Sequence, residues 1–179
     1  MTPAIELIFT PKEWLTLISM SEKVILVVYG RGGHQEQMRR LLMLLRASAP
    51  DMKFVSIADV EDKLGSQQHF ICPEPRDKFS NWLAPFSLVY SACVSLFQCI
   101  LLCIKYDVSG IVSTGPGMAV VPSIILRLLG RPVIFIESWS RFYTGSLTGH
   151  AMYRVATNFF VQNVSMLEVF PKAKYAGRL

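Results

Sequence analysis

The spacing of apolar residues along the chain alternates between the period of a strand and the period of a helix. An unbroken, β-branched apolar run at 24–29 stops at Gly30, which predicts a strand buried on both faces. Apolar residues then recur at helical spacing over 35–48, with arginines on the opposite side, which predicts an amphipathic helix. The same reasoning predicts further strands at 53–58, 69–72, 108–113, 133–137 and 158–162, and a helix at 118–129.

Strands that alternate with helices are typical of a parallel sheet with helices on both faces. We therefore expect a single α/β, Rossmann-like domain in which 158–162 is the last strand. The length of 179 residues suits one domain and is too short for a self-contained two-domain enzyme. An apolar content of 51% with only 17% charged residues excludes intrinsic disorder.

Two segments predict contact with a membrane. The segment 1–22 contains a capping box, Thr10-Pro11-Lys12-Glu13, that begins an amphipathic helix; this helix either packs on its own domain, 23–179, or lies at the membrane interface. The uncharged run 81–104 meets the length criterion for a membrane-spanning helix. Because it lies between predicted strands of one sheet, we favour a helix that packs on the sheet and dips into the membrane over a true span.

Charge and cysteine content narrow the classes of ligand. A formal net charge of +5 suits an anionic membrane surface, and no block of Lys and Arg is long enough to predict nucleic-acid binding. The cysteines at 72, 93, 99 and 103 form no CxxC pair, so we expect reduced, buried thiols. His69 and Cys72 form an isolated H-x-x-C without a second ligand pair, so we predict no metal site and no cofactor.

The loop that follows the first predicted strand carries the most informative chemistry. In a parallel sheet, ligands bind beyond the carboxyl ends of the strands. Here the loop reads Gly30-Arg31-Gly32-Gly33-His34, whose glycines let backbone amides approach an anion at a helix N-terminus. His34 falls in the first turn, where the helix dipole favours a neutral imidazole that can accept a proton. His34 is therefore a candidate base, and the alternative is that it only caps the helix.

Two later loops, each after a predicted strand, add polar groups. Ser113-Thr114-Gly115-Pro116-Gly117 enters a helix and offers backbone amides and a hydroxyl, or is simply a tight turn. Glu137-Ser138-Trp139-Ser140-Arg141 gathers a carboxylate, hydroxyls and a guanidinium that suit a sugar or a diphosphate, or is a solvated loop. From these loops the candidate sugar- or phosphate-binding residues are Thr114, Gly115, Gly117, Ser138 and Arg141.

Taken in order, these motifs resemble one protein family. GRGGH, STGPG, FIESWSRFYTGSLTG, and VQN followed by PKAKYAGRL are similar to the acceptor-side, membrane-associated subunit of split glycosyltransferases. That family includes the Alg-type anchoring subunit of a UDP-GlcNAc transferase and bacterial PssD-like and EpsE-like proteins of exopolysaccharide and capsule synthesis. The resemblance covers about 24–179. Because 1–20 is not an apolar spanning segment, the sequence favours the bacterial branch.

The resemblance implies half of an enzyme. A GT-B glycosyltransferase has two Rossmann-like halves, and this chain supplies the equivalent of the N-terminal one, so a separate donor-binding subunit is expected to supply the other. The complex would transfer a sugar from a UDP-sugar to a polyprenyl-diphosphate-linked sugar at the cytoplasmic face of the inner or plasma membrane. The alternatives are a non-catalytic membrane anchor that enhances a partner enzyme and a stand-alone nucleotide-binding enzyme.

The resemblance also implies roles for the loop residues. His34 would remove the proton of the acceptor hydroxyl, and Glu137 would orient that hydroxyl or act as the alternative base. Arg141 would pair with phosphate, as Arg31 would. The amides that would hold the acceptor diphosphate belong to Gly30, Gly32 and Gly33.

Overall fold

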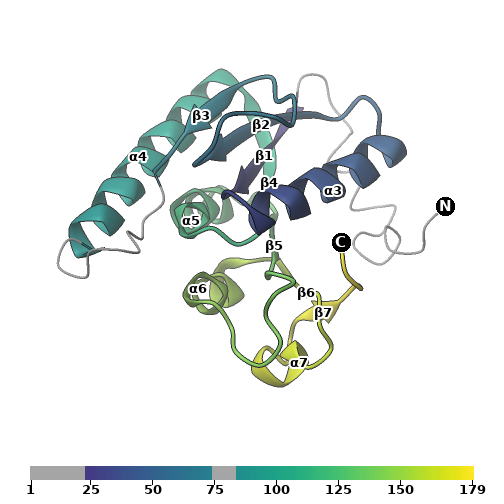
Figure 1. Ribbon diagram of the computed structural model, residues 1–179. Helices are drawn as coiled ribbons and strands as arrows, with labels where there is room; N and C mark the ends of the chain where they lie inside the picture. The colour runs from purple at the N-terminus through teal and green to yellow at the C-terminus, as the bar shows by residue number, and fades with distance from the viewer. Residues whose placement is uncertain (1–22, 74–83) are drawn as a thin grey trace.

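The computed structural model describes residues 23–73 and 84–179, which form one parallel sheet. In chain order the strands are β1 Lys23–Tyr29, β2 Lys53–Ala58, β3 His69–Ile71, β4 Asp107–Ser113, β5 Val133–Ile136, β6 Asn158–Val161 and β7 Lys174–Tyr175. Their order across the sheet is β3-β2-β1-β4-β5-β6-β7, and every neighbouring pair is parallel (Figure 1). The predicted α/β, Rossmann-like fold is confirmed.

The helices cover both faces of this sheet. They are α3 Gly33–Ser48, α4 Ala84–Lys105, α5 Val120–Leu128 with the 3-10 turn η1 Gly117–Ala119 before it, α6 Leu147–Val155 and α7 Met166–Val169. In Figure 1, α3 lies on one face, and α4, α5 and α6 lie on the other. Every crossover therefore returns the chain to the same edge, so the carboxyl ends of all the strands meet there.

The central strand shows why this arrangement is stable. The side chains of Val24, Leu26 and Val28 enter the core shared with α4, α5 and α6. Those of Ile25, Val27 and Tyr29 enter the second core, which contains Leu41 and other residues of α3. A strand that is apolar at every position fits only between two helical layers, as the run at 24–29 predicted.

Three sequence predictions need correction. The strand at 158–162 is not the last, because the two-residue β7 pairs with β6 beyond it. The helix at 118–129 is divided into η1 and α5. The helix α6 was not predicted, because Gly149 interrupts its apolar pattern and its start depends on the Ser146 hydroxyl, which accepts from the Gly149 amide at 2.7 Å.

Helix α4 leaves most of its large apolar residues exposed. On its inner face, Ser91 donates to the Pro73 carbonyl at 2.7 Å and Gln98 donates to the Ile71 carbonyl at 2.8 Å. The same face buries Cys99 and Leu102 against the sheet. The exposed apolar residues of α4 are Phe86, Leu88, Val89, Tyr90, Leu96, Phe97, Ile100, Leu101 and Ile104. The helix therefore packs on the sheet, as the sequence predicts, through polar and apolar residues of one face.

By length and composition, the part of α4 from Phe86 to Lys105 is apolar enough to cross a membrane, with a mean hydropathy of 2.1. The outward side of this helix also explains a wrong prediction about the cysteines. Cys72 and Cys99 are buried, but Cys93 is exposed on α4. The segment 1–22, with its predicted amphipathic helix, lies outside the described residues, as do the first positions of the run 81–104.

Candidate functional site

The three predicted loops meet at the carboxyl edge of the sheet. His34 of the first loop is hydrogen-bonded to Thr114 of the second. A Cβ atom placed on Gly33 would lie 3.6 Å from the indole nitrogen of Trp139, so the third loop reaches the N-terminus of α3. Asn163, which follows β6, donates to the Trp139 carbonyl at 3.0 Å and holds that loop in place. The structure thus brings the three sequence-predicted loops together.

His34 is held in one orientation by a reciprocal pair of hydrogen bonds. Its Nδ1 lies 2.5 Å from the Thr114 carbonyl oxygen, and the Thr114 hydroxyl donates to the His34 carbonyl at 2.9 Å. A carbonyl oxygen only accepts hydrogen bonds, so Nδ1 carries the proton and Nε2 of the neutral ring is the unprotonated nitrogen. No hydrogen bond joins Nε2 to another of the described residues. The geometry leaves His34 able to accept a proton at Nε2.

Two glycines make room for the His34 ring. Gly115 has φ +119°, and a Cβ atom there would lie 2.7 Å from His34 Cε1. A Cβ on Gly30 would lie 3.6 Å from His34 Cδ2, on the adjacent edge of the same ring. Gly115 therefore serves both the turn and the close approach of the ring, whereas Gly117 begins the 3-10 turn that follows.

The N-terminus of α3 is open. Gly32 is the N-cap residue at φ +69°, and no side chain caps the helix there. The amides of the first turn have no partner within the helix, which suits an anion. Beside them, Arg31 donates from Nε to Asp59 Oδ2 at 2.7 Å and from Nη2 to the Asp59 carbonyl at 3.2 Å, while its side chain stays 67% exposed. Sequence reasoning did not single out Asp59.

Glu137 faces the start of α6. The residue is only 1% exposed, and its carboxylate accepts from the Ser138 amide at 2.9 Å and from the Ser146 hydroxyl at 3.0 and 3.1 Å. A Cβ on Gly149 would lie 1.9 Å from Glu137 Oε2, so only glycine fits there. With its oxygens occupied in this way, Glu137 shapes the loop between β5 and α6. The Ser138 hydroxyl is bonded to that of Ser140.

Arg141 presents a cation at the outer side of the same loop. The residue is exposed, and its guanidinium makes no hydrogen bond or ion pair with any residue in the described part of the chain. Its backbone is fixed on both sides, since its amide donates to the Ser138 carbonyl at 3.0 Å and its carbonyl accepts from Asn163. The backbone of Arg141 is therefore held in place, while its side chain is available to an anionic ligand.

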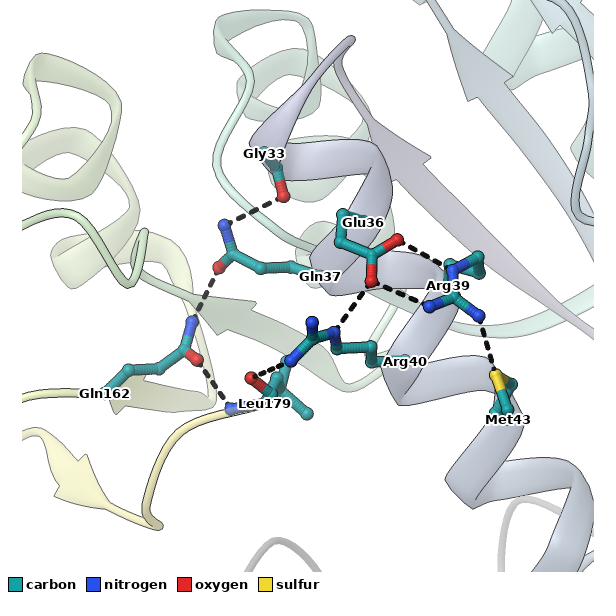
Figure 2. A network of polar contacts seen from close by, with 8 residues as sticks. All are labelled: Gly33, Glu36, Gln37, Arg39, Arg40, Met43, Gln162 and Leu179. Carbon is teal, nitrogen blue, oxygen red and sulfur yellow. Dashed lines mark hydrogen bonds and ion pairs between the residues drawn. The ribbon is translucent and has the colours of Figure 1, made fainter.

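Buried side-chain amides connect the N-terminus of α3 to the loop after β5. Gln162 donates to Gln37 Oε1 at 2.6 Å, and Gln37 donates to the Gly33 carbonyl at 3.1 Å (Figure 2). Gln162 also donates to the Glu137 carbonyl at 2.9 Å. The Leu179 amide donates to Gln162 Oε1 at 2.9 Å, which brings the last residues to α3. Sequence analysis missed the signal carried by Gln162, a polar residue directly after the apolar strand β6. Gln162 is buried at the carboxyl edge of the sheet.

Metal ligands do not gather at this edge. Among the described residues, no group of three or more His, Cys, Asp or Glu side chains could hold a metal ion. In the isolated H-x-x-C, His69 Nδ1 lies 2.7 Å from the Ser56 hydroxyl and Nε2 lies 2.8 Å from the Val60 carbonyl oxygen. Both of its ring nitrogens therefore have protein partners.

Comparison with known proteins agrees with the resemblance noted in the sequence. A family described as "Oligosaccharide biosynthesis protein Alg14 like" matches residues 25–179. The chain belongs to the Alg14-like family. Relatives of this Alg14-like chain include UDP-N-acetylglucosamine transferase subunit ALG14 of Mus musculus, 29% identical over 95% of the chain and 85% of the relative. The Candida albicans protein of the same name is 28% identical over 99% and 86%.

Solved structures share the fold of the Alg14-like chain. MurG of Acinetobacter baumannii matches 87% of the chain with a TM-score of 0.57 at 17% identity. UDP-GlcNAc 2-epimerase of Methanocaldococcus jannaschii matches 83% with a TM-score of 0.59 at 9% identity. The chain spans 45% and 42% of those two proteins, respectively, which is less than half of each. At these identities the likeness concerns the fold alone, and it agrees with one Rossmann-like half of a two-domain architecture.

Proposed function

We propose that this chain is the acceptor-binding subunit of a two-component inverting glycosyltransferase. The complex transfers a sugar from a UDP-sugar to a polyprenyl-diphosphate-linked sugar. The observation that carries the proposal is the orientation of His34, whose Nδ1–H is fixed on the Thr114 carbonyl so that Nε2 can act as a base. Membership of the Alg14-like family and the match to less than half of MurG support the division into two subunits.

The chemical step follows from this orientation. His34 Nε2 takes the proton of an acceptor hydroxyl while that oxygen attacks the anomeric carbon of the donor sugar. A new carbon–oxygen bond forms on one face, and the bond to UDP breaks on the opposite face, with its electron pair leaving on the diphosphate. Thr114 and Gly115 act as positioning residues for His34. Of the two candidate bases, His34 is favoured, because the oxygens of Glu137 accept from Ser138 and Ser146.

The acceptor diphosphate binds at the open N-terminus of α3. The backbone amides of Gly32 and Gly33 donate to its oxygens, and Arg141 pairs with its charge from the facing loop. Arg31 adds to the positive potential although it is shared with Asp59. The loop residues Gly117 and Ser138 frame the same edge, and no cofactor is needed for this chemistry.

The names of the relatives suggest the donor. The mouse and Candida proteins are named as UDP-N-acetylglucosamine transferase subunits, so we propose UDP-N-acetylglucosamine as the first donor to test and a separate donor-binding chain as the partner. The setting in bacterial exopolysaccharide or capsule synthesis, at the cytoplasmic face of the inner or plasma membrane, rests on the motif resemblance described above.

Helix α4 supplies the membrane contact in this proposal. A helix that turns serine and glutamine inward and leaves Phe97, Ile100 and Ile104 exposed reverses the usual pattern of a water-soluble protein. One face of α4 packs on the sheet, and the opposite face is apolar and exposed. This arrangement suits a helix that lies in the membrane surface. Such a position presents the carboxyl edge of the sheet to a lipid-linked acceptor.

The proposal is tested with the assembled pair. Transfer of labelled N-acetylglucosamine to a polyprenyl-diphosphate sugar is measured for the chain alone, the partner alone and the two together. His34→Ala should lower kcat by about 10²- to 10⁴-fold, the usual contribution of a general base, while the pair still co-purifies. The exposed His150 provides the matched control, and His150→Ala should keep wild-type turnover.

Two outcomes would contradict the catalytic role. Undiminished transfer by the His34→Ala pair would remove His34 from the mechanism. Full turnover by the detergent-soluble partner alone would favour the second candidate, a non-catalytic membrane anchor, for which the exposed apolar face of α4 is the supporting observation.

A further inference from the structure

Asp59 is a buried carboxylate beside the candidate base. It follows β2 directly, at the same carboxyl edge as the Gly30 and Thr114 loops, and its side chain is only 1% exposed. Oδ2 accepts from Arg31 Nε at 2.7 Å. Oδ1 has no hydrogen-bond partner among the residues that the structure describes.

This unpartnered oxygen is buried close to the His34 ring. A Cβ atom placed on Gly30 would be 3.7 Å from Asp59 Oδ1 and 3.6 Å from His34 Cδ2. Oδ1 and Cδ2 are therefore at most 7.3 Å apart, the sum of those two distances. Pro116 closes the third side, with its Cβ 3.4 Å from the same point. Three strand-end loops thus surround one position, and the two polar groups are close enough together to contact one sugar ring.

The chemistry of Oδ1 determines what kind of group it binds. A buried carboxylate oxygen without a donor is costly, and the cost is removed when a ligand donates a hydrogen bond. A diphosphate is excluded as the partner, since it carries the same sign of charge and has no proton to donate. The remaining groups of a lipid-linked acceptor are the hydroxyls and any amide N–H of its sugar.

We propose that Asp59 Oδ1 accepts a hydrogen bond from a hydroxyl or amide N–H of the acceptor sugar and so selects that sugar. The inference rests on the proposed function, because it takes the acceptor to be a sugar. The exposed Arg31 side chain donates to Oδ2, and the described residues provide no donor to the buried Oδ1. An enzyme site built around a hydrogen bond to substrate discriminates strongly against an analogue that lacks the donor.

Asp59→Asn is the decisive variant. Asparagine keeps the volume, and its carbonyl oxygen can still accept from Arg31. Its NH₂ group then takes the place of Oδ1 and cannot accept a hydrogen bond. Glu61→Gln is the matched control, because it also removes one negative charge, two residues along, from an exposed side chain.

The experiment crosses these variants with a set of acceptors. Short-chain polyprenyl-diphosphate sugars are prepared as the parent compound, as each monodeoxy analogue and, for an N-acetylated sugar, without the acetamido group. In the wild-type pair, one analogue should lose about 100-fold in kcat/KM relative to the parent. With the parent acceptor, kcat/KM of the Asp59→Asn pair should be about 100-fold below that of the wild-type pair. With the sensitive analogue, kcat/KM of the variant should fall no further, because the effects of two groups in direct contact are not additive. Glu61→Gln should behave as the wild type.

Several outcomes would overturn the inference. Wild-type indifference to every analogue is one, and an equal loss by Asp59→Asn with all acceptors, as a merely structural role predicts, is another. Binding of the parent acceptor to the pair is measured calorimetrically in parallel, and equal affinity of wild type and Asp59→Asn would also overturn it. Failure of the wild-type pair to transfer any sugar would count against the proposed function, while the binding comparison would still decide the role of Asp59.

Discussion

Replacing Gly115 by alanine should displace the imidazole ring of His34, the candidate base. Gly115 has φ +119°, a conformation that costs about 1–3 kcal/mol for an L-residue. The new Cβ would also lie 2.7 Å from His34 Cε1 and 2.9 Å from Nδ1, closer than such atoms approach. The ring is tethered to the Thr114 carbonyl, so it must give up that bond or shift with it. We expect a free energy of unfolding lower by about 2–3 kcal/mol.

The activity of the assembled pair reports the displacement of the ring. A shift of the reacting group by part of an ångström to one ångström lowers kcat by about 10- to 100-fold. Gly130→Ala is the matched control, since Gly130 also has a positive φ of +74° but has no atom within 4 Å of its Cβ position. The free energy of unfolding of Gly130→Ala should be lower by about 1–2 kcal/mol, and its kcat should be unchanged. For a chain of this size, the melting temperature should fall by about 4–12 °C for Gly115→Ala and about 2–8 °C for Gly130→Ala.

A second background sharpens this test. In His34→Ala the clashing ring is absent, so Gly115→Ala should there cost no more stability than Gly130→Ala costs in the wild type. Thermal unfolding of the single and double variants measures this coupling. The reasoning would be refuted by a Gly115→Ala pair with wild-type kcat, or by a stability cost that is the same whether or not His34 is present.

Three further predictions concern the supports of the site, the surface of α3 and the membrane face. Ser146→Ala removes the N-cap of α6 and a donor to buried Glu137, and should lower the free energy of unfolding by about 2–4 kcal/mol in urea, against about 0.5 kcal/mol or less for exposed Ser140→Ala; equal losses would contradict the role of Ser146. Hydrogen bonds from Arg39, and then from Arg40, lower the pKa of Glu36 from 4.5 to about 2. This stabilisation is therefore complete above pH 4.5 and is lost as the pH falls toward 2, so unfolding midpoints of wild type and Glu36→Gln should converge on acidification, and a constant difference would contradict it. Phe97→Glu should reduce flotation with anionic phospholipid vesicles, whereas Met43→Glu, an exposed apolar position on the other face of the sheet, should not; equal flotation of all three proteins would argue against α4 as the membrane face.

The strands and the location of the site were predictable because their signals are local. A continuous apolar run such as 24–29 has to lie between two layers, and the run at 53–58 matches β2 residue for residue. Once the strands are parallel, their carboxyl ends share one edge, so the loops with His34, Thr114 and Glu137 had to lie near each other. The chemistry of the GRGGH loop could therefore be assigned to that edge from the sequence.

The roles of individual side chains could not be predicted in this way. Glu137 and Asp59 are both acidic residues after a strand, but the first accepts from Ser146 at the start of α6 and the second leaves one oxygen free beside Gly30. Their difference depends on which loop packs over each carboxylate. The serines of α4 likewise read as a diluted apolar run. In the structure Ser91 donates to the Pro73 carbonyl just beyond β3, whereas Ser95 donates to the Ala92 carbonyl within α4 itself.

By itself, then, the sequence determined the parallel α/β fold, the edge at which the candidate site lies and the residue types available there, because strand period, helix period and glycine turns are properties of neighbouring residues. Only the tertiary structure decided which nitrogen of His34 is free, since its partner Thr114 is 80 positions away. The bond between Gln37 and Gln162 spans 125 positions. Contacts at such separations arise when the sheet forms and leave no periodic pattern in the chain, so hydrogen-bond partners and side-chain directions are decided by packing.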